Sequence, residues 1–224
     1  MSQVRFYGSK LSSAGASPSN ATGGYVKRIF DVAGALFLIL LLSPLMAMIA
    51  GLIVLTEGRP FFIRHKRIGH GGSEFHCLKF RTMVANADDI LGEHLAQNPS
   101  AEQQWRTNRK LTDDPRITEL GRVLRKSSLD ELLQLFNIVK GDMSLVGPRP
   151  IVRDESTNYG AAFQEYIRAR PGLTGLWQVK GRSNTSYAER VKLDSEYVSS
   201  WSFRGDVVIL LLTVPSVLAA KGSV

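Results

Sequence analysis

A run of about 25 residues, Val32–Thr56, contains no charged side chain, and it limits what the chain can fold into more than any other feature. A helix needs about 20 mostly apolar residues to cross a hydrocarbon core about 30 Å thick. Basic residues stand on both sides of the run, with Lys27 and Arg28 before it and Arg59 after it. The sequence therefore predicts a membrane element over residues 25–57.

A proline divides this run into halves that are too short to cross a membrane alone. Each half, Val32–Leu42 and Leu45–Leu55, would extend about 16 Å as a helix, which matches one leaflet. Pro44 removes a backbone donor and bends or breaks a helix, and the Ser43 hydroxyl can bond a carbonyl that the break frees. Because basic flanks tend to stay cytoplasmic, a re-entrant helix–break–helix fits the pattern. A kinked helix that crosses fully stays open on these grounds, since spanning helices tolerate proline.

The 224-residue chain has a net charge of +8, and 21% of its residues are charged. This length leaves room for the membrane element and one modest domain. A basic chain attracts nucleic acid and anionic lipid alike. Given the membrane element, lipid headgroups and phosphorylated substrates are the favoured partners, and no nucleic-acid partner is expected. Cys77 is the only cysteine, which excludes an intramolecular disulfide and agrees with a cytoplasmic domain.

Composition divides the chain into three segments. Residues 1–24 are rich in Ser, Gly, Ala and Asn without hydrophobic periodicity, which predicts a disordered tail. Residues 25–57 form the membrane element, and residues 58–224 form a cytoplasmic domain. Two runs rich in β-forming residues, Phe61–Ile68 and Glu74–Phe80, flank a glycine-rich loop and predict a β-hairpin.

The rest of the domain has mostly helical composition. Helices are expected over 85–109 with a break near Pro99, from Asp114-Pro115 onward, and over 128–139, 155–170 and 187–201. Val207–Ala220 is apolar but too short to span a membrane, so we expect an amphipathic helix in the membrane interface. The predicted fold class is therefore α+β and mostly helical, with a small cytoplasmic domain on a re-entrant anchor.

Among four adjacent acidic pairs, the pair Asp130-Glu131 has the most informative context. Ser128 and Glu131 fit a capping box at the start of a leucine-rich helix. A helix start carries partial positive charge and binds phosphate, so an ionised Asp130 there could act as a nucleophile on phosphorus. The alternative, that the two acids merely cap a helix, is slightly favoured by the local sequence.

The following loop strengthens the chemical interpretation. Arg149 lies between Pro148 and Pro150, and flanking prolines restrict the backbone. An arginine presents a planar fork that matches phosphate. A zinc site from His65, His76 and Cys77 is disfavoured, because three residues at this spacing match no usual zinc pattern.

Together these features resemble a known family. The segment Leu124–Pro150 resembles the core signature of the bacterial sugar transferases, the monotopic polyprenol-phosphate hexose-1-phosphate (phosphoglycosyl) transferases. The likeness covers nearly everything from Tyr25 onward. The chain looks like the minimal form of the family, which initiates exopolysaccharide repeat units. It is also carried by Lys27–Asp31, Ser43-Pro44, Lys79–Met83, Asp114–Thr118, Arg170–Gly175, Gln178–Arg182 and Tyr197–Asp206. The family commonly has proline where Leu133 stands, a difference that leaves the acid pair untouched.

This resemblance implies a reaction and a catalytic dyad. Asp130 and Glu131 match the dyad, and Asp130 would attack the β-phosphate of a UDP-sugar. UMP would leave, and undecaprenyl phosphate would then remove the phosphosugar from the aspartate. Mg²⁺ is expected at the diphosphate with Asp130 as its ligand. Glucose or galactose phosphate is the expected cargo by analogy with exopolysaccharide-initiating enzymes.

The resemblance also implies further contacts and a location. Arg125, Arg149 and Arg182 match residues that contact phosphate and nucleotide, and the membrane helix would break at Ser43-Pro44. The expected location is the bacterial inner (cytoplasmic) membrane, among its lipids, with the catalytic domain facing the cytoplasm. A homo-oligomer is left open. Two alternatives also stay open: direct attack by the lipid phosphate without a covalent intermediate, and a non-catalytic basic scaffold on the membrane.

Overall fold

The computed structural model describes residues 21–108, 111–180 and 185–218. The predicted disordered tail, 1–24, falls almost wholly outside these residues. Helices dominate the fold, and two small two-stranded sheets complete it. This confirms the predicted α+β, mostly helical class.

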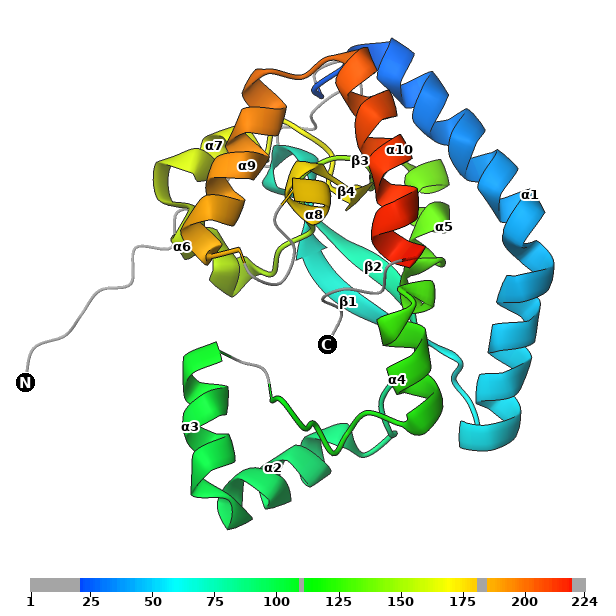
Figure 1. Ribbon diagram of the computed structural model, residues 1–224, viewed down its shortest axis with the longest axis vertical. Helices are drawn as coiled ribbons and strands as arrows, with labels where there is room; N and C mark the ends of the chain where they lie inside the picture. The colour runs from blue at the N-terminus through cyan, green and yellow to red at the C-terminus, as the bar shows by residue number, and fades with distance from the viewer. Residues whose placement is uncertain (1–20, 109–110, 181–184, 219–224) are drawn as a thin grey trace, which may run out of the picture.

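A single long helix, α1 (Gly24–Glu57), bows along one side of the molecule (Figure 1). The structure differs here from the predicted helix–break–helix, because α1 continues without interruption through Pro44. Proline at position 44 leaves the carbonyl of Leu40 without its usual helical donor. The Ser43 hydroxyl donates to that carbonyl over 2.9 Å, as the sequence led us to expect. This bond compensates for the lost donor, and the re-entrant path stays a prediction.

Most of the surface of α1 is not covered by the rest of the protein. In the described part of the chain it is the one helix long and apolar enough to cross a membrane, and 17% of its most apolar stretch is buried. Ala35, Met46, Ile49 and Ile53 face the domain. The exposed apolar side chains include Leu36, Phe37, Leu40, Leu41, Met48, Leu52 and Leu55. A helix that exposes this much apolar surface is expected to contact an apolar partner rather than water.

Buried ionic contacts fasten the first turns of α1 to the domain. The ammonium of Lys27 lies 2.7 Å from Asp206 Oδ2 and 3.6 Å from Asp31 Oδ1. The guanidinium of Arg28 donates to the carbonyls of Ile138 and Val139 over 2.6 and 2.9 Å. These contacts fix the angle at which α1 leaves the domain.

The predicted hairpin is present as β1 (Phe62–Ile68) and β2 (Glu74–Phe80), which pair antiparallel. Phe75 and Cys77 on β2 are buried in the main core with Leu135 and Ile138. Phe80, at the end of β2, packs in a second core with Met46, Ile49 and Ile53 of α1. The hairpin therefore joins the membrane element to the centre of the domain.

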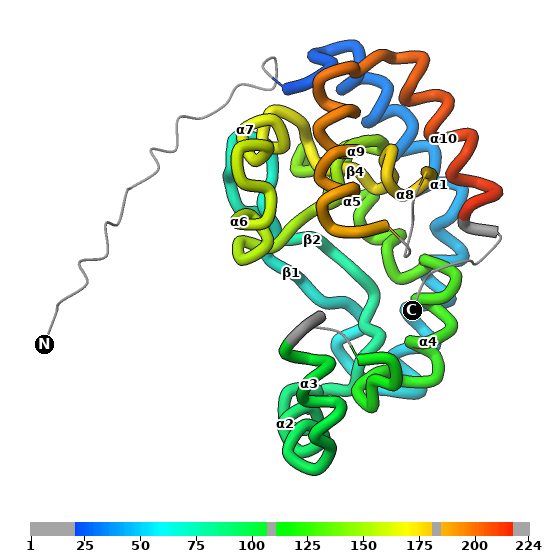
Figure 2. The backbone as a smooth tube through the Cα atoms, turned by 60° about the vertical axis from the view of Figure 1, so that its left-hand side comes forward, coloured from blue at the N-terminus to red at the C-terminus, as the bar shows by residue number. Residues whose placement is uncertain are grey.

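Two helices, α2 (Ala87–Gln97) and α3 (Pro99–Asn108), form an arm that projects from the rest of the molecule (Figures 1 and 2). The predicted break near Pro99 is confirmed, since Pro99 opens α3. The next helix, α4 (Glu119–Lys126), begins later than expected, because Thr118 caps it by accepting from the amide of Gly121.

The predicted helix over 128–139 is wrong in its first half. Ser128 adopts a left-handed conformation with φ 58° and makes no cap bond, a 3-10 turn covers Leu129–Glu131, and α5 (Gln134–Lys140) begins only afterwards. The expected capping box is absent because Glu131 bonds to a lysine side chain, described below, instead of the Ser128 amide.

The C-terminal part wraps around a short parallel pair, β3 (Ser144–Val146) and β4 (Gly172–Thr174). The expected helix over 155–170 is replaced by short turns, with α6 (Ser156–Tyr159) and α7 (Phe163–Tyr166). Gly160 separates them at φ 51°, a conformation that ends a helix.

Three helices complete the chain: α8 (Leu176–Lys180), α9 (Tyr187–Ser199) and α10 (Phe203–Leu218). The last helix leaves Val208, Leu211 and Val214 more than half exposed. Its side chains therefore suit the interfacial position expected of it, which stays a prediction.

Candidate active site

Asp130 and Glu131 lie in the 3-10 turn that connects α4 to α5. The side chain of Asp130 is 11% exposed and that of Glu131 is 28% exposed. The turn places both carboxylates against the end of β2 rather than on a helix face. The structure thus brings the predicted pair together in a half-closed site, but without the long helix expected behind it.

A lysine that the sequence did not place at the acid pair lies between the two acids. The ammonium of Lys79, at the end of β2, is 2.6 Å from Glu131 Oε1 and 3.4 Å from Asp130 Oδ2. Lys79 follows buried Phe75 and Cys77 at alternate positions of the strand. A lysine on the inward face of a strand needs a charged partner, and this alternation was the signal for it.

Burial and charge act differently on the three groups. Burial raises the pKa of Asp130 above its ordinary value, although the charge of Lys79 opposes this. Burial acts in the same direction on Glu131, but the charges of Lys79 and Arg149 outweigh it and lower the pKa of that carboxyl. Burial would lower the pKa of Lys79, yet the two carboxylates raise it. The surroundings therefore shift the pKa of Asp130 upward and that of Glu131 downward.

The first predicted phosphate-contacting arginine, Arg125, stands in the last turn of α4. Its Nε donates to Thr82 Oγ1 over 2.9 Å, and its positive charge acts on Asp130. Gly121 allows this arrangement, since a Cβ at that position would collide with the backbone of Thr82. Close packing of α4 on Thr82 therefore aims Arg125 at the site.

The second arginine predicted to contact phosphate, Arg149, lies in the loop after β3. Its guanidinium carbon lies 5.5 Å from the centre of the Trp177 ring, and its charge lowers the pKa of Glu131. Burial raises the pKa of Asp194 on α9 to about 7, although the backbone of Arg149 contributes to lowering it. The contact with Trp177 positions the side chain of this arginine. The third predicted arginine, Arg182, lies outside the described residues.

Arg67 on β1 is a further cation that acts on the acid pair, a position that the sequence did not predict. Its charge contributes to lowering the pKa of Glu131. Burial, together with the charges of Arg67, Lys79 and Arg125, also lowers the pKa of His65. Lys79, Arg67, Arg125 and Arg149 therefore act on one small region. Such a set suits a ligand with several negative charges, because guanidinium and ammonium groups are the usual phosphate partners.

No cluster of three or more His, Cys, Asp and Glu residues that could hold a metal occurs in the part of the chain that the structure describes. Cys77, one of the residues weighed for zinc, is buried, and burial raises the pKa of its thiol to about 11. A zinc ligand must be a thiolate. The acid pair does fit Mg²⁺, which typically takes one or two carboxylates and completes its shell with water and substrate phosphates.

The chain matches the family model of the bacterial sugar transferases over residues 22–220. Over 201 residues it is 53% identical to the exopolysaccharide production protein ExoY of Sinorhizobium fredii, covering 90% of this chain and 89% of that protein. Over 205 residues it is 42% identical to the UDP-glucose:undecaprenyl-phosphate glucose-1-phosphate transferase of Caulobacter vibrioides. The match covers 88% of this chain and 71% of that protein.

A longer relative shows the same core. The undecaprenyl-phosphate galactose phosphotransferase of Salmonella typhimurium is 47% identical over 199 residues, which cover 89% of this chain and 42% of that protein. Matches of this length and identity leave one conclusion: the chain belongs to the bacterial sugar transferase family.

Proposed function

We propose that this enzyme, a phosphoglycosyl transferase, moves hexose-1-phosphate from a UDP-sugar to undecaprenyl phosphate and so initiates an exopolysaccharide repeat unit. One observation supports this most: a buried, basic carboxylate, Asp130, lies beside Glu131 among four cations. A nucleophile for phosphorus must keep its lone pair while its surroundings neutralise phosphate charge. The names of the relatives fit the same donor and acceptor classes.

In the first step, an oxygen of the Asp130 carboxylate attacks the phosphorus that bears the sugar. A bond forms between this oxygen and phosphorus, and the bond from phosphorus to the bridging oxygen of UMP breaks. UMP departs with that bonding pair, and the hexose phosphate stays on Asp130. Arg125 and Arg149 stabilise the negative charge that develops on the phosphoryl oxygens.

In the second step, a phosphate oxygen of undecaprenyl phosphate attacks the same phosphorus. The bond to Asp130 breaks, and the carboxylate returns to its starting state with the product released as undecaprenyl diphospho-hexose. Asp130 needs no proton at either stage. Burial raises the pKa of Asp130, which favours its attack on phosphorus. The positive charge of Lys79 favours the return of this carboxylate as an anion.

Glu131 and Lys79 position the nucleophile. The 2.6 Å ion pair between them holds the Lys79 ammonium where it also touches Asp130. Asp130 and the diphosphate oxygens would hold Mg²⁺, which when bound would neutralise charge on the diphosphate. Arg182, outside the described residues, is proposed to contact the nucleotide.

The location proposed is the inner membrane, with the domain on the cytoplasmic face. The exposed apolar side chains of α1 and α10 support membrane attachment. A re-entrant α1 would keep Asp130 at the depth of the lipid phosphates, and Pro44 with Ser43 supports a bend there. Glucose and galactose are the proposed sugars, because relatives with both names align over most of this chain.

A panel of UDP-sugars tests the proposed function. Purified enzyme with Mg²⁺ and undecaprenyl phosphate should release UMP from UDP-glucose or UDP-galactose and yield a lipid-linked diphospho-sugar. Asp130→Asn supplies the matched inactive control, because it keeps the shape of the side chain. Failure to release UMP from every sugar tested would overturn the proposal, and release of UDP instead would identify a different transferase chemistry.

A further inference from the structure

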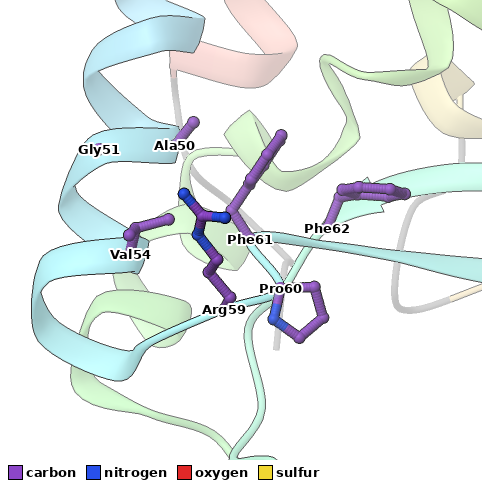
Figure 3. Close-up of a pocket in the computed structure, with 7 residues that line it drawn as sticks. All are labelled: Ala50, Gly51, Val54, Arg59, Pro60, Phe61 and Phe62. Atoms are coloured by element: carbon purple, nitrogen blue, oxygen red, sulfur yellow. The ribbon is translucent and has the colours of Figure 1, made fainter.

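A groove of about 520 Å³ lies between the second half of α1 and the segment that leads into β1 (Figure 3). Ala50, Gly51 and Val54 line it from the helix, and residues 59–62 line it from the connecting segment. Its lining is apolar apart from Arg59. The groove therefore combines an apolar surface with one cationic side chain.

The groove opens beside exposed apolar side chains of α1. Leu52 and Leu55 on the neighbouring turns are 41% and 84% exposed. A molecule that enters from the apolar surroundings of α1 can therefore reach the groove without crossing water. Two aromatic rings, Phe61 and Phe62, form its other wall with centroids 5.1 Å apart, which offers a broad apolar contact surface.

Arg59 extends into the space between Val54 and Phe61 (Figure 3). Among the described residues it makes no hydrogen bond or ion pair. The two residues before it, in contrast, are held in place, because Arg81 donates to the carbonyls of Glu57 and Gly58 over 2.7 and 2.8 Å. A positioned cation without an anion beside an apolar groove suits a ligand with an apolar chain and a negative head.

The groove is joined to the acid pair through β2. Phe62 pairs with Phe80 across the hairpin, and Phe80 follows Lys79, which bonds both acids. The Phe61 carbonyl accepts from the amide of Arg81 over 2.9 Å. A ligand in the groove therefore lies against the start of β1, the strand that pairs with the lysine-bearing strand β2.

We propose that this groove binds the isoprenoid chain of the prenyl phosphate acceptor close to its phosphate, and that Arg59 pairs with that phosphate. The inference rests on the proposed function, because it assigns a binding site to the second substrate of that reaction. An ordinary phospholipid would satisfy the charge of Arg59 equally. The acceptor is favoured because the groove ends at β1, whose partner strand β2 carries the lysine bonded to Asp130, and only the acceptor phosphate has to reach that carboxylate.

Filling the groove is the most direct test. A Cβ at Gly51 would meet no atom within 4 Å, so Gly51→Phe adds a ring to the groove without a clash, and it replaces a poor helix former. We expect the KM for the prenyl phosphate to rise about tenfold, the equivalent of a modest loss of binding, relative to the KM for UDP-sugar. Gly92→Phe is the control, because Gly92 on the distant α2 is equally open.

Charge is tested separately at Arg59. Arg59→Gln should raise the KM for the prenyl phosphate about fivefold, and Arg59→Lys should restore part of it. Inhibition by prenyl alcohol, which has the chain but no phosphate, should weaken in Gly51→Phe and stay unchanged in Arg59→Gln. This pattern would separate the apolar contact from the ionic one.

Three outcomes would overturn the inference. The first is an equal acceptor KM in Gly51→Phe and Gly92→Phe. The second is an acceptor KM that does not respond to Arg59→Gln. The third is displacement of a photoreactive prenyl phosphate from the groove by phosphatidylglycerol as readily as by unlabelled prenyl phosphate, which would make the groove a general lipid site. If UMP release from UDP-sugar fails in the unmodified enzyme, the proposed function falls instead.

Discussion

In the part of the chain that the structure describes, a lysine lies between two carboxylates at two places, and these differ in what surrounds them. At the base of α1, Lys27 contacts Asp31 and Asp206, and the two acids are 2% and 0% exposed. At the end of β2, Lys79 contacts Asp130 and Glu131 in a partly open site. The same charge pattern therefore appears once in the interior and once at a surface.

At the base of α1, neutral donors saturate both acids. Asp31 accepts from the Ser144 hydroxyl and the Leu145 amide over 2.7 and 3.1 Å. Asp206 accepts from the Tyr197 hydroxyl over 2.8 Å and from Trp201 Nε1 over 3.1 Å. A buried charge cluster whose oxygens are all bonded has little capacity for a ligand. We interpret it as the joint that sets the position of α1.

The acid pair at the end of β2 has surplus positive charge instead. Arg67, Arg125 and Arg149 act on it in addition to Lys79. Within the described residues, Lys79 is the side chain that donates hydrogen bonds to both acids. The difference indicates that spare bonding capacity, more than burial or charge alone, separates a chemical site from a structural one.

The largest effect is expected at the proposed nucleophile. Asp130→Asn removes the attacking anion and should lower turnover by about 10⁴-fold or more, as loss of a covalent nucleophile typically does. Its melting temperature should stay close to that of the unmodified enzyme, because the shape is conserved. Turnover and thermal unfolding of the same sample check both halves of this prediction. Residual activity above a hundredth would contradict the role of Asp130.

The buried cluster of Lys27, Asp31 and Asp206 should show the opposite pattern, with the effect of a substitution falling on stability. Asp206→Ala leaves the buried Lys27 ammonium without its 2.7 Å partner, and breaking a buried pair from one side costs about 3–5 kcal/mol. We expect a clear fall in thermal stability, measured in detergent or nanodiscs. Glu131→Gln serves as the matched comparison, because its carboxylate is partly exposed and its loss should destabilise far less. Equal destabilisation of the two variants would remove the distinction between the clusters.

Loss of the site lysine should affect rate and pH dependence together. Lys79→Met removes a charge that lowers the pKa of Asp130, and kcat/KM should fall about 10²-fold, as for loss of one preorganised electrostatic partner. With that charge gone, the pKa of Asp130 rises and the acid side of the pH–rate profile moves to higher pH. A uniform loss of rate without this movement would assign Lys79 to folding alone.

The unmodified enzyme should itself show a displaced acid limb. Burial raises the pKa of Asp130 above 3.8, and only the ionised carboxylate can attack phosphorus. The rate should therefore rise with pH through that higher pKa and level off above it. The pH dependence of kcat/KM checks this in the free enzyme. An acid limb at or below the ordinary aspartate value would show that Asp130 is not desolvated.

The smallest effect is expected in the membrane helix. Ser43→Ala removes the donor to the Leu40 carbonyl that Pro44 leaves unpaired, which should cost about 1 kcal/mol. Thermal unfolding checks this, and Thr56→Ala, which removes a similar hydroxyl-to-carbonyl bond near the helix end, is the matched control. A loss no larger than that of Thr56→Ala would mean that the carbonyl of Leu40 finds another donor.

Local patterns in the sequence predicted the hairpin well, because alternation and a glycine-rich loop are sufficient to define β1 and β2. They failed at Ser128, where a matching capping pattern lost to a long-range ion pair between Glu131 and Lys79. They failed again over 155–170, where Gly160 interrupts a helical composition. Contacts between residues far apart in sequence decided these cases.

The site shows the same division. Asp130, Glu131 and Arg149 could be selected from local context, since acids in a turn and an arginine between prolines are visible in the sequence. Lys79 and Arg67 could not be assigned, because their roles depend on the hairpin folding back on the turn after α4. The continuous path of α1 through Pro44 departs from the predicted break, and the Ser43 hydroxyl bonds the carbonyl that proline leaves free.

The central claim is a covalent bond between Asp130 and the phosphorus of a hexose phosphate. Enzyme mixed with UDP-sugar and Mg²⁺, without lipid acceptor, and quenched within one turnover should release UMP in an amount equal to the enzyme. Mass spectrometry of the digested protein should find one hexose phosphate on the peptide that carries Asp130. UMP release that requires undecaprenyl phosphate, with no such adduct at any time, would contradict the claim and establish direct transfer.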